Sequence, residues 1–391
     1  MKEKLLIFGL FVATVAGAIG FPLLFAGSEA TETPRNDRPV KKFSGQQMRG
    51  FAIQMHNGES THPYIDYIDE VAKTGANTVC LVAMGYQENC SSTSIFIESR
   101  KTPSADHLGR LIRHARKRGL KVVLMPIVLL ENPRGGEWRG KINPTDWNDW
   151  WEDYTNFILY FAGVAHDNKA EVFMVGSELI STETQTEKWN QLIDKVRRRY
   201  TGLLSYSANW DHYKPVTFWD KLDIIGMTTY YDLAGGRKQH SLEALMGEWK
   251  PIKEKILAWQ KKINRPILFT EVGWPNQATC VSQPWNYYGA QDKPAPKLQA
   301  RCFEAFFETW KDEPAVAGYI LWEWPSHPKH GKHPKYGYSG EDTSYVPKGK
   351  PAMKVISRYL TRDPNTAANT DENKNADTPE PEKETKTPSE G

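Results

Sequence analysis

Two glutamates stand where predicted strands end, and together they are the strongest chemical signal in the sequence. Glu178 follows V-G-S in V-G-S-E-L, and Glu271 follows the apolar run P-I-L-F in the stretch F-T-E-V-G-W-P-N. A single glutamate at a strand end is most often solvated or salt-bridged. Two that face one cavity can cleave a glycosidic bond, because one can donate a proton while the other stays ionised.

The separation of such a pair decides the stereochemistry. Carboxyl groups about 5 Å apart suit retention of the anomeric configuration, whereas about 6.5–9.5 Å suits inversion. In either case neighbouring groups must drive the two pKa values apart.

The elements that must position these glutamates are eight short apolar runs. They begin at Gly50, Thr78, Lys121, Glu171, Leu203, Asp223, Pro266 and Gly318. Near-continuous apolar runs are typical of parallel strands that are covered on both faces. We expect Phe269, in the seventh run, to help fill the interior of the barrel that such strands would form.

Helical patterns separate most of the runs. They cover residues 104–119, 147–165, 187–200, 242–263 and 297–312, whereas the gap between the fifth and sixth runs has room for a stub of helix at most. Eight alternating β and α units predict a single-domain (β/α)8 TIM barrel over residues 49–361. The alternative, a doubly wound open sheet, would need a glycine-rich phosphate turn after an early strand, and the sequence has none.

The ends of the chain do not belong to this barrel. Residues 5–26 are apolar and follow Lys2 and Lys4, so residues 1–30 are predicted to be either a cleaved signal peptide or a membrane-attached signal anchor. Both alternatives predict export to the periplasm, the cell envelope or the outside of the cell. Residues 31–48 are predicted to be a polar linker and residues 362–391 a disordered polar tail, because neither segment can offset its ordering entropy.

The charge and the aromatic content of the chain indicate which class of ligand it binds. The net charge of +3 is too small to indicate nucleic acid. The 14 tryptophans favour flat contact surfaces such as those of sugar-binding clefts. We expect a carbohydrate partner, a monomeric protein, and no metal or cofactor. The histidines of the loop S-H-P-K-H-G-K-H, beginning at Ser326, lie among lysines that repel a cation, so a basic loop at the rim is favoured over a metal site.

The four cysteines leave their pairing open. Cys280 and Cys302 flank one loop and could close it with a disulfide, which export would permit. Cys80 lies in an apolar run and is either a buried thiol or a partner for Cys90.

In a barrel of this type the active face lies at the carboxyl ends of the strands. The other candidate substrate-binding residues gather at these ends or in the adjoining loops. They are His56, Tyr86, Trp138, Arg139, Asn209, Trp210, Tyr230, Trp274 and Trp322. For the aromatic residues, stacking on a sugar ring competes with simple loop packing, and we expect about half of the loop tryptophans to be structural. Arg139 either meets a substrate hydroxyl or pairs with a carboxylate, and the pairing is favoured. Glu131 and Glu323 are interpreted as loop ligands or salt-bridge partners.

Several stretches together resemble glycoside hydrolase family 113, a family of the clan A retaining β-glycosidases whose characterised members are β-1,4-mannanases. They are W-R-G-K-I from Trp138 with the aromatic helix after it, V-G-S-E-L, D-I-I-G-M-T-T-Y-Y, T-E-V-G-W with P-W after it, W-E-W and G-K-P-A. The likeness spans residues 50–360. It implies a retaining β-glycoside hydrolase that acts on a mannan-like polysaccharide or oligosaccharide by double displacement.

The resemblance also implies roles for single residues. Glu178 corresponds to the acid/base and Glu271 to the nucleophile, while Tyr230 corresponds to a tyrosine that bonds the nucleophile. Trp322 corresponds to the floor of the sugar site. Ser177 is a departure, because the clan usually has an asparagine here that contacts the sugar 2-hydroxyl.

This departure keeps the sugar preference open, since another group, such as Asn209, would have to supply that contact. Two alternatives also stay open: a barrel that binds envelope glycans without cleaving them, and another clan A activity such as a β-glucanase.

Overall fold

The computed structural model describes residues 40–361 except 238, 287–292 and 327–341. The predictions for residues 1–30, the first part of the linker, the histidine-containing loop and the tail at 362–391 lie outside the described residues. In the part of the chain that is described, no helix has both the length and the apolar character needed to cross a membrane.

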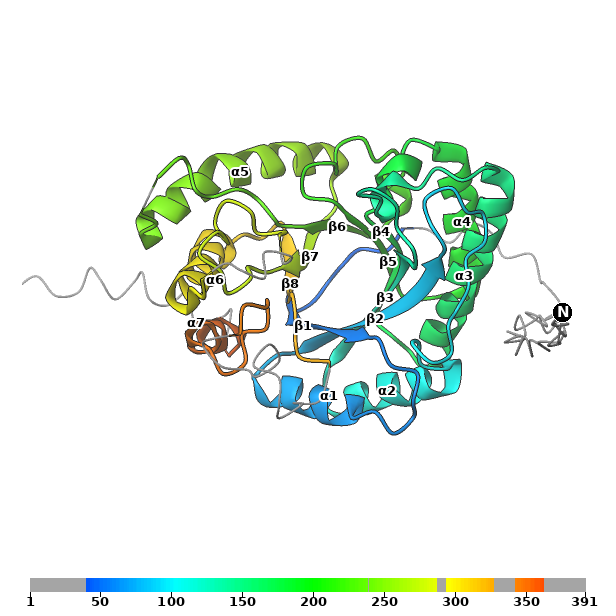
Figure 1. The fold of residues 1–391 in the computed structure, drawn as a ribbon, viewed down its shortest axis with the longest axis horizontal. Helices are drawn as coiled ribbons and strands as arrows, with labels where there is room; N and C mark the ends of the chain where they lie inside the picture. The colour runs from blue at the N-terminus through cyan, green and yellow to red at the C-terminus, as the bar shows by residue number, and fades with distance from the viewer. Residues whose placement is uncertain (1–39, 238, 287–292, 327–341, 362–391) are drawn as a thin grey trace, which may run out of the picture. The chain divides into compact units, whose positions relative to one another are not determined.

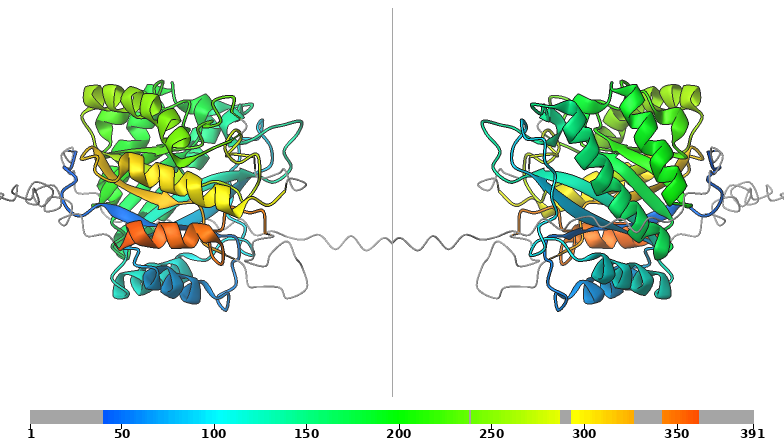
Figure 2. Two further views of the ribbon diagram at one scale, coloured as in Figure 1. Left: turned by 90° about the vertical axis from the view of Figure 1, so that its left-hand side faces the viewer. Right: turned by 90° about the vertical axis from the view of Figure 1, so that its right-hand side faces the viewer.

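Eight parallel strands close into a barrel in chain order, and helices surround it (Figure 1). The strands are β1 Met48–Met55, β2 Thr78–Gln87, β3 Lys121–Leu130, β4 Val172–Ser177, β5 Leu203–Ala208, β6 Ile224–Thr228, β7 Ile267–Val272 and β8 Val316–Leu321. The predicted (β/α)8 barrel is confirmed. Long loops after β3 and β7 extend from one end of it (Figure 2).

The helices follow the predicted segments closely. They are α1 Tyr64–Lys73, α2 Ala105–Lys117, α3 Trp147–Asp167, α4 Thr186–Arg199, α5 Leu242–Ile263, α6 Pro296–Trp310 and α7 Pro351–Leu360. Between β5 and β6 the described chain forms only a 3-10 turn, η3 (Trp219–Lys221), as the short gap predicted. Capping side chains fix several starts; the Ser104 hydroxyl, for example, accepts the N–H of His107 at the start of α2.

The core has two layers, because alternate strand residues face opposite sides of the barrel wall. Leu268 belongs to the inner layer, together with Val82, Met125 and Met174. The expectation for Phe269 was wrong: its ring packs outside the barrel against Phe306 and Trp310 of α6. The side-chain period of two places neighbouring residues on opposite faces, so Leu268 and Phe269 cannot both fill the interior.

All four cysteines are buried free thiols. Cys80 lies in the inner layer of the barrel, so its interpretation as a buried thiol holds. The disulfides considered for Cys80 with Cys90 and for Cys280 with Cys302 are not formed.

Candidate active site

An extra residue interrupts each of the strands that carry the two glutamates. The register of β4 against β5 shifts after Met174, and the register of β7 against β8 shifts after Phe269. Such bulges break the in–out alternation and re-aim the side chains that follow. Glu178 comes directly after the irregular part of β4, and Glu271 lies within that of β7.

The effect is clear in β7. Leu268 faces the barrel interior, and so does Thr270, whose hydroxyl lies 2.6 Å from the Ser207 hydroxyl of the non-adjacent strand β5. Strict alternation would turn Glu271 outward toward the helices. Instead, its Oε2 accepts the hydroxyl of Tyr230 at 2.8 Å, beyond the end of β6. The bulge therefore turns Glu271 into the mouth of the barrel.

Thr228, the last residue of β6, lies next to both glutamates. It pairs in register with Glu271 on the neighbouring strand. Its hydroxyl also lies 3.5 Å from Oε1 of Glu178. Glu178 and Glu271 thus lie on either side of one residue, and the charge of Glu178 acts on the Glu271 carboxyl group. Both are buried, with 7% and 4% of the residue surface exposed.

Burial is the main influence on both acids. It raises the pKa of Glu271, and the charge of Glu178 raises it further, against the opposing effects of Arg139 and the Tyr230 hydroxyl. Burial likewise raises the pKa of Glu178, against the opposing effects of Arg139 and Thr228. Because two adjacent buried charges are costly, ionisation of one of these carboxyl groups opposes ionisation of the other.

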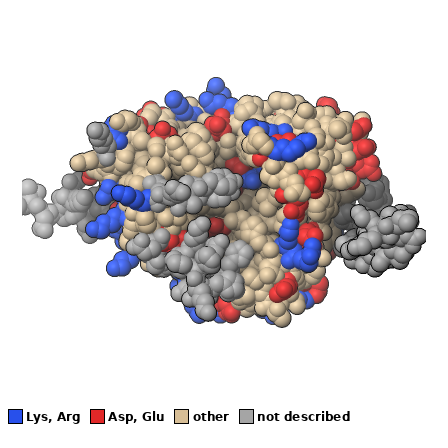
Figure 3. Space-filling model, in the orientation of Figure 1, with Lys and Arg blue, Asp and Glu red and all other residues tan. Residues whose placement is uncertain are grey.

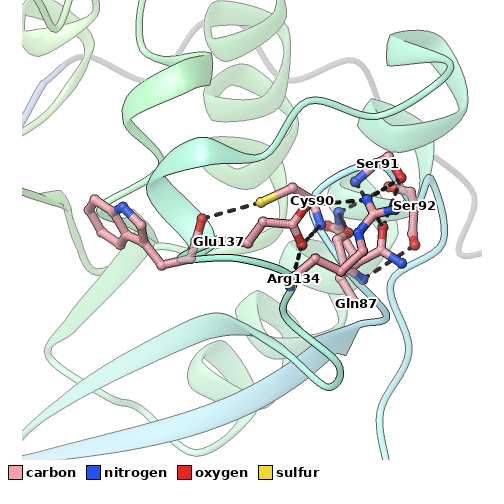
Figure 4. A network of polar contacts seen from close by, with 8 residues as sticks. Gln87, Cys90, Ser91, Ser92, Arg134 and Glu137 are labelled. Carbon is pink, nitrogen blue, oxygen red and sulfur yellow. Dashed lines mark hydrogen bonds and ion pairs between the residues drawn. The ribbon is translucent and has the colours of Figure 1, made fainter. Parts of the chain in front are cut away.

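Arg139 pairs with a carboxylate, as the sequence favoured. Its Nη2 lies 2.6 Å from Oε2 of Glu178. The loops after β2 and β3 hold this part of the chain through a polar network (Figure 4). In it, the Cys90 thiol donates to the carbonyl of Trp138 at 3.5 Å, and Arg134 donates to the Ser91 hydroxyl at 2.8 Å. The network fixes the residue that precedes Arg139.

Residues from β1 and β8 border Glu271. His56 lies just past β1, and its Nε2 is 2.8 Å from Oε1 of Gln54. Gln54 in turn donates to Glu323, whose negative charge contributes to the raised pKa of Glu271. Trp322 follows β8 and is partly exposed, and its backbone N–H bonds the carbonyl of Val272 at 2.8 Å. His56 and Trp322 therefore lie at the same mouth as Glu271.

Aromatic residues border the other side. The backbone N–H of Trp210 donates to the Thr228 hydroxyl at 3.0 Å, and the same hydroxyl lies 3.5 Å from Glu178, so Trp210 lies near Glu178. Its ring stacks on that of Trp285, with centroids 6.0 Å apart, and Trp285 is 46% exposed. The Asn209 amide donates to Asp211 at 2.6 Å. The tryptophan pair offers a flat surface beside the two acids.

Two aromatic expectations need correction. Trp274 is fully buried, with its ring against Phe303, so no face is open to a sugar. Its position after β7 places it at the correct end of the barrel, but the loop turns it back onto α6. Tyr86 is 5% exposed, and the Lys101 ammonium lies 4.9 Å from its ring centroid. Little of Tyr86 is therefore accessible for stacking.

Sequence reasoning placed the glutamates but missed the residues that hold them. Thr228 lies in M-T-T-Y with nothing in its type to mark it.

Glu131 forms an ion pair with Lys101, as expected. Glu323 instead bonds Gln54, and no cation pairs with it among the described residues. Acidic and basic side chains are interspersed on the face in Figure 3.

Comparison with known proteins matches most of the chain to one family. The model of Glycoside Hydrolase Family 113 matches residues 50–350. One solved β-1,4-mannanase of that family is 27% identical, covering 82% of this chain and 100% of its own, with a TM-score of 0.70. A β-mannanase of the same family from Alicyclobacillus acidocaldarius is 28% identical, covering 82% of this chain and 99% of its own, with a TM-score of 0.72.

A more distant likeness shows the fold alone. The endo-β-1,4-mannanase from Thermotoga petrophila is 11% identical, covering 81% of this chain and 77% of its own, with a TM-score of 0.53. A search of curated proteins found no match. The family match and the two mannanases of similar length confirm the resemblance that the motifs indicated. This chain belongs to glycoside hydrolase family 113 and is a β-glycoside hydrolase of clan A.

Proposed function

We propose that this protein is an exported retaining β-mannanase that cleaves β-1,4-linked mannan-like chains by double displacement. The observation that carries the proposal is the convergence of Glu178 and Glu271, both buried, on Thr228 at the carboxyl end of the barrel. The two family mannanases support the sugar class. The apolar segment at residues 5–26 supports export.

In the first step, a carboxylate oxygen of Glu271 forms a bond to the anomeric carbon. The bond from that carbon to the glycosidic oxygen breaks, and Glu178 gives its proton to the departing oxygen. In the second step, Glu178 takes a proton from water, and the water oxygen displaces Glu271 from the anomeric carbon. Each residue returns to its initial state, and the anomeric configuration is retained.

The neighbouring side chains support the role of Glu271 as nucleophile better than the role of Glu178 as acid. The Tyr230 hydroxyl stabilises the ionised form of Glu271, as a nucleophile requires. Arg139 contacts Glu178 and stabilises its ionised form too, which opposes its role as an acid. The first step needs a protonated Glu178 and an ionised Glu271, so Arg139, which favours loss of the Glu178 proton, limits the pH range in which that state is populated.

Replacing Arg139 with Gln should move the pH profile of kcat/KM to higher pH. The alkaline limb reports loss of the proton from Glu178, and the acidic limb reports protonation of Glu271. Arg139 lowers both pKa values, so its removal raises both. We expect both limbs to move to higher pH. Steady-state kinetics between pH 4 and pH 9 measure this, and an unchanged or downward-shifted profile would contradict the assignment.

Sugar recognition relies on groups other than the one the clan normally uses. The Ser177 hydroxyl is buried and has no hydrogen-bond partner within the described part of the chain, and the Asn209 amide donates to Asp211. His56 and Glu323 offer polar groups on the side of Glu271, and Trp322 offers an aromatic surface there.

Product analysis over mannan, glucan and xylan tests the proposed substrate. We expect mannan to be cleaved to short oligosaccharides and the other two to be cleaved at least about 100-fold more slowly. Faster cleavage of glucan would replace the mannanase proposal with a β-glucanase. Binding of a glycan without cleavage of any polymer would support the non-catalytic alternative.

A further inference from the structure

A polar cluster of Glu183, Tyr206 and His212 lies near Glu178, and the proposed reaction does not use it. Glu183 has no exposed surface. Its Oε1 accepts the hydroxyl of Tyr206 at 2.7 Å, and its Oε2 lies 2.6 Å from Nδ1 of His212. Burying a carboxyl group costs desolvation free energy, which the hydrogen bonds to both of its oxygens offset here.

The cluster reaches the candidate acid through one hydroxyl. Tyr206 accepts the backbone N–H of Leu179, the residue after Glu178, at 2.9 Å. A tyrosine hydroxyl has a single proton, and here that proton goes to Glu183. The oxygen therefore keeps a lone pair directed at Leu179. Burial and the nearby Glu183 raise the pKa of Tyr206, so the hydroxyl remains a donor.

The backbone at Glu178 needs such support. Its φ of 52° lies in the left-handed region, which a residue with a side chain rarely adopts because it is strained there. Two successive N–H groups fix this conformation. The N–H of Glu178 donates to the carbonyl of Ser207 at 2.8 Å, and the N–H of Leu179 donates to Tyr206. The first bond belongs to the strand pair, and the second depends on the cluster.

We propose that Tyr206, Glu183 and His212 are positioning residues for Glu178. They stabilise the strained backbone of Glu178, which directs the Glu178 carboxyl group into the mouth of the barrel. Glu183 orients the Tyr206 hydroxyl, and His212, with a third of its side chain exposed, partners the second oxygen of Glu183. This inference rests on the proposed acid/base role of Glu178.

A positioning role predicts a selective defect. A misplaced Glu178 delivers its proton poorly, which matters when the leaving group is a sugar. A dinitrophenolate leaves without that proton, so formation of the glycosyl-enzyme should stay fast with such a substrate. A role limited to stability would instead lower the rates for all substrates together.

The test compares Tyr206→Phe with a matched control, Tyr200→Phe. Tyr200 is also buried, and its hydroxyl donates at 2.8 Å to the carbonyl of Ala170, before the opposite end of β4. Both variants lose one buried hydroxyl, and thermal unfolding measures that shared cost. For Tyr206→Phe we expect kcat/KM to fall about 10- to 100-fold on mannohexaose and less than about 3-fold on dinitrophenyl β-mannobioside. Tyr200→Phe should show no such difference between substrates.

A conservative pair of variants adds a second readout. Glu183→Gln keeps an oxygen that can accept the Tyr206 proton, so it should retain most activity on mannohexaose, whereas Glu183→Leu should show the selective loss. Equal losses on the two substrates in Tyr206→Phe, or equal behaviour of Gln and Leu at position 183, would overturn the proposal.

Two features separate this test from that of the proposed function. The dinitrophenyl substrates include β-glucosides and β-xylosides as well as β-mannosides. If the wild-type protein cleaves one of the others but no mannoside, the mannanase assignment is overturned. Tyr206→Phe and Tyr200→Phe are then compared on the glycoside that is cleaved. A crystal structure of Tyr206→Phe needs no turnover. We expect Glu178 to leave its left-handed conformation in this variant, and an unchanged φ at Glu178 would contradict the inference.

Discussion

Replacement of Glu271 with Gln should lower kcat on mannan by at least about 10⁴-fold, because the amide cannot form the glycosyl-enzyme. Gln keeps the size of the side chain and can still accept the Tyr230 hydroxyl that now bonds Oε2, so the barrel should stay folded. Polymer hydrolysis and circular dichroism measure the two effects. The expected pattern is loss of turnover with an unchanged thermal unfolding midpoint or a modestly raised one, since Gln removes a buried charge.

Glu323→Gln is the matched control for this substitution. Glu323 is a second carboxyl group at the same mouth, and it accepts a hydrogen bond from Gln54. Its charge raises the pKa of Glu271. We expect its loss to reduce kcat/KM by about 10-fold, through sugar contacts rather than chemistry. If Glu323→Gln were as inactive as Glu271→Gln, or if Glu271→Gln kept near-normal turnover, the nucleophile would have been assigned to the wrong residue.

Glu178→Ala should produce the second-largest effect, and its signature differs. Loss of the proton donor should slow cleavage of mannohexaose by about 10²–10⁴-fold and leave the first step on dinitrophenyl β-mannobioside nearly unaffected. The second step then lacks a base, so the glycosyl-enzyme should accumulate. Azide, which needs no base, should restore turnover and yield a β-mannobiosyl azide, detected by mass spectrometry.

Glu131→Ala serves as its control, because Glu131 pairs with Lys101 and contacts neither Glu178 nor Glu271 among the described residues. It should keep wild-type kinetics and show no response to azide. An α-configured azide from Glu178→Ala would indicate inversion instead of double displacement and would contradict the proposed mechanism.

The fold could be predicted because its signals are local and repeated. Eight apolar runs and the helical patterns between them each report on a single element, and the order of elements leaves few topologies. The segment 242–263 even coincides with α5. The error at Phe269 arose at a finer level. The sequence shows that β7 is apolar on both faces, but not which face is inward, and Leu268 and Phe269 are equally apolar.

The site could be predicted only where chemistry marks a residue. Carboxyl groups at strand ends are unusual enough to notice, so the sequence singles out Glu178 and Glu271, which the structure brings to the same mouth of the barrel. The bulges that turn them into the mouth leave no mark in the sequence, because they depend on the register between neighbouring strands. Trp274 shows the opposite case: its type suits a sugar site, yet the structure buries it against Phe303.

The residues behind Glu178 were missed for a related reason. Tyr206 lies in the apolar run of β5, where a tyrosine is ordinary packing, and Glu183 lies in a polar loop, where a glutamate is ordinary solvation. Only their contact in three dimensions gives either a distinct role.

Covalent labelling tests the central claim most directly. The protein is incubated with an activated 2-deoxy-2-fluoro β-mannoside, whose fluorine slows the second step so that the glycosyl-enzyme persists. Peptide mapping by mass spectrometry should find one fluorosugar on the peptide that contains Glu271, with none on the Glu271→Gln variant. A label on any other side chain, or steady hydrolysis of mannan by a protein that never becomes labelled, would contradict the account.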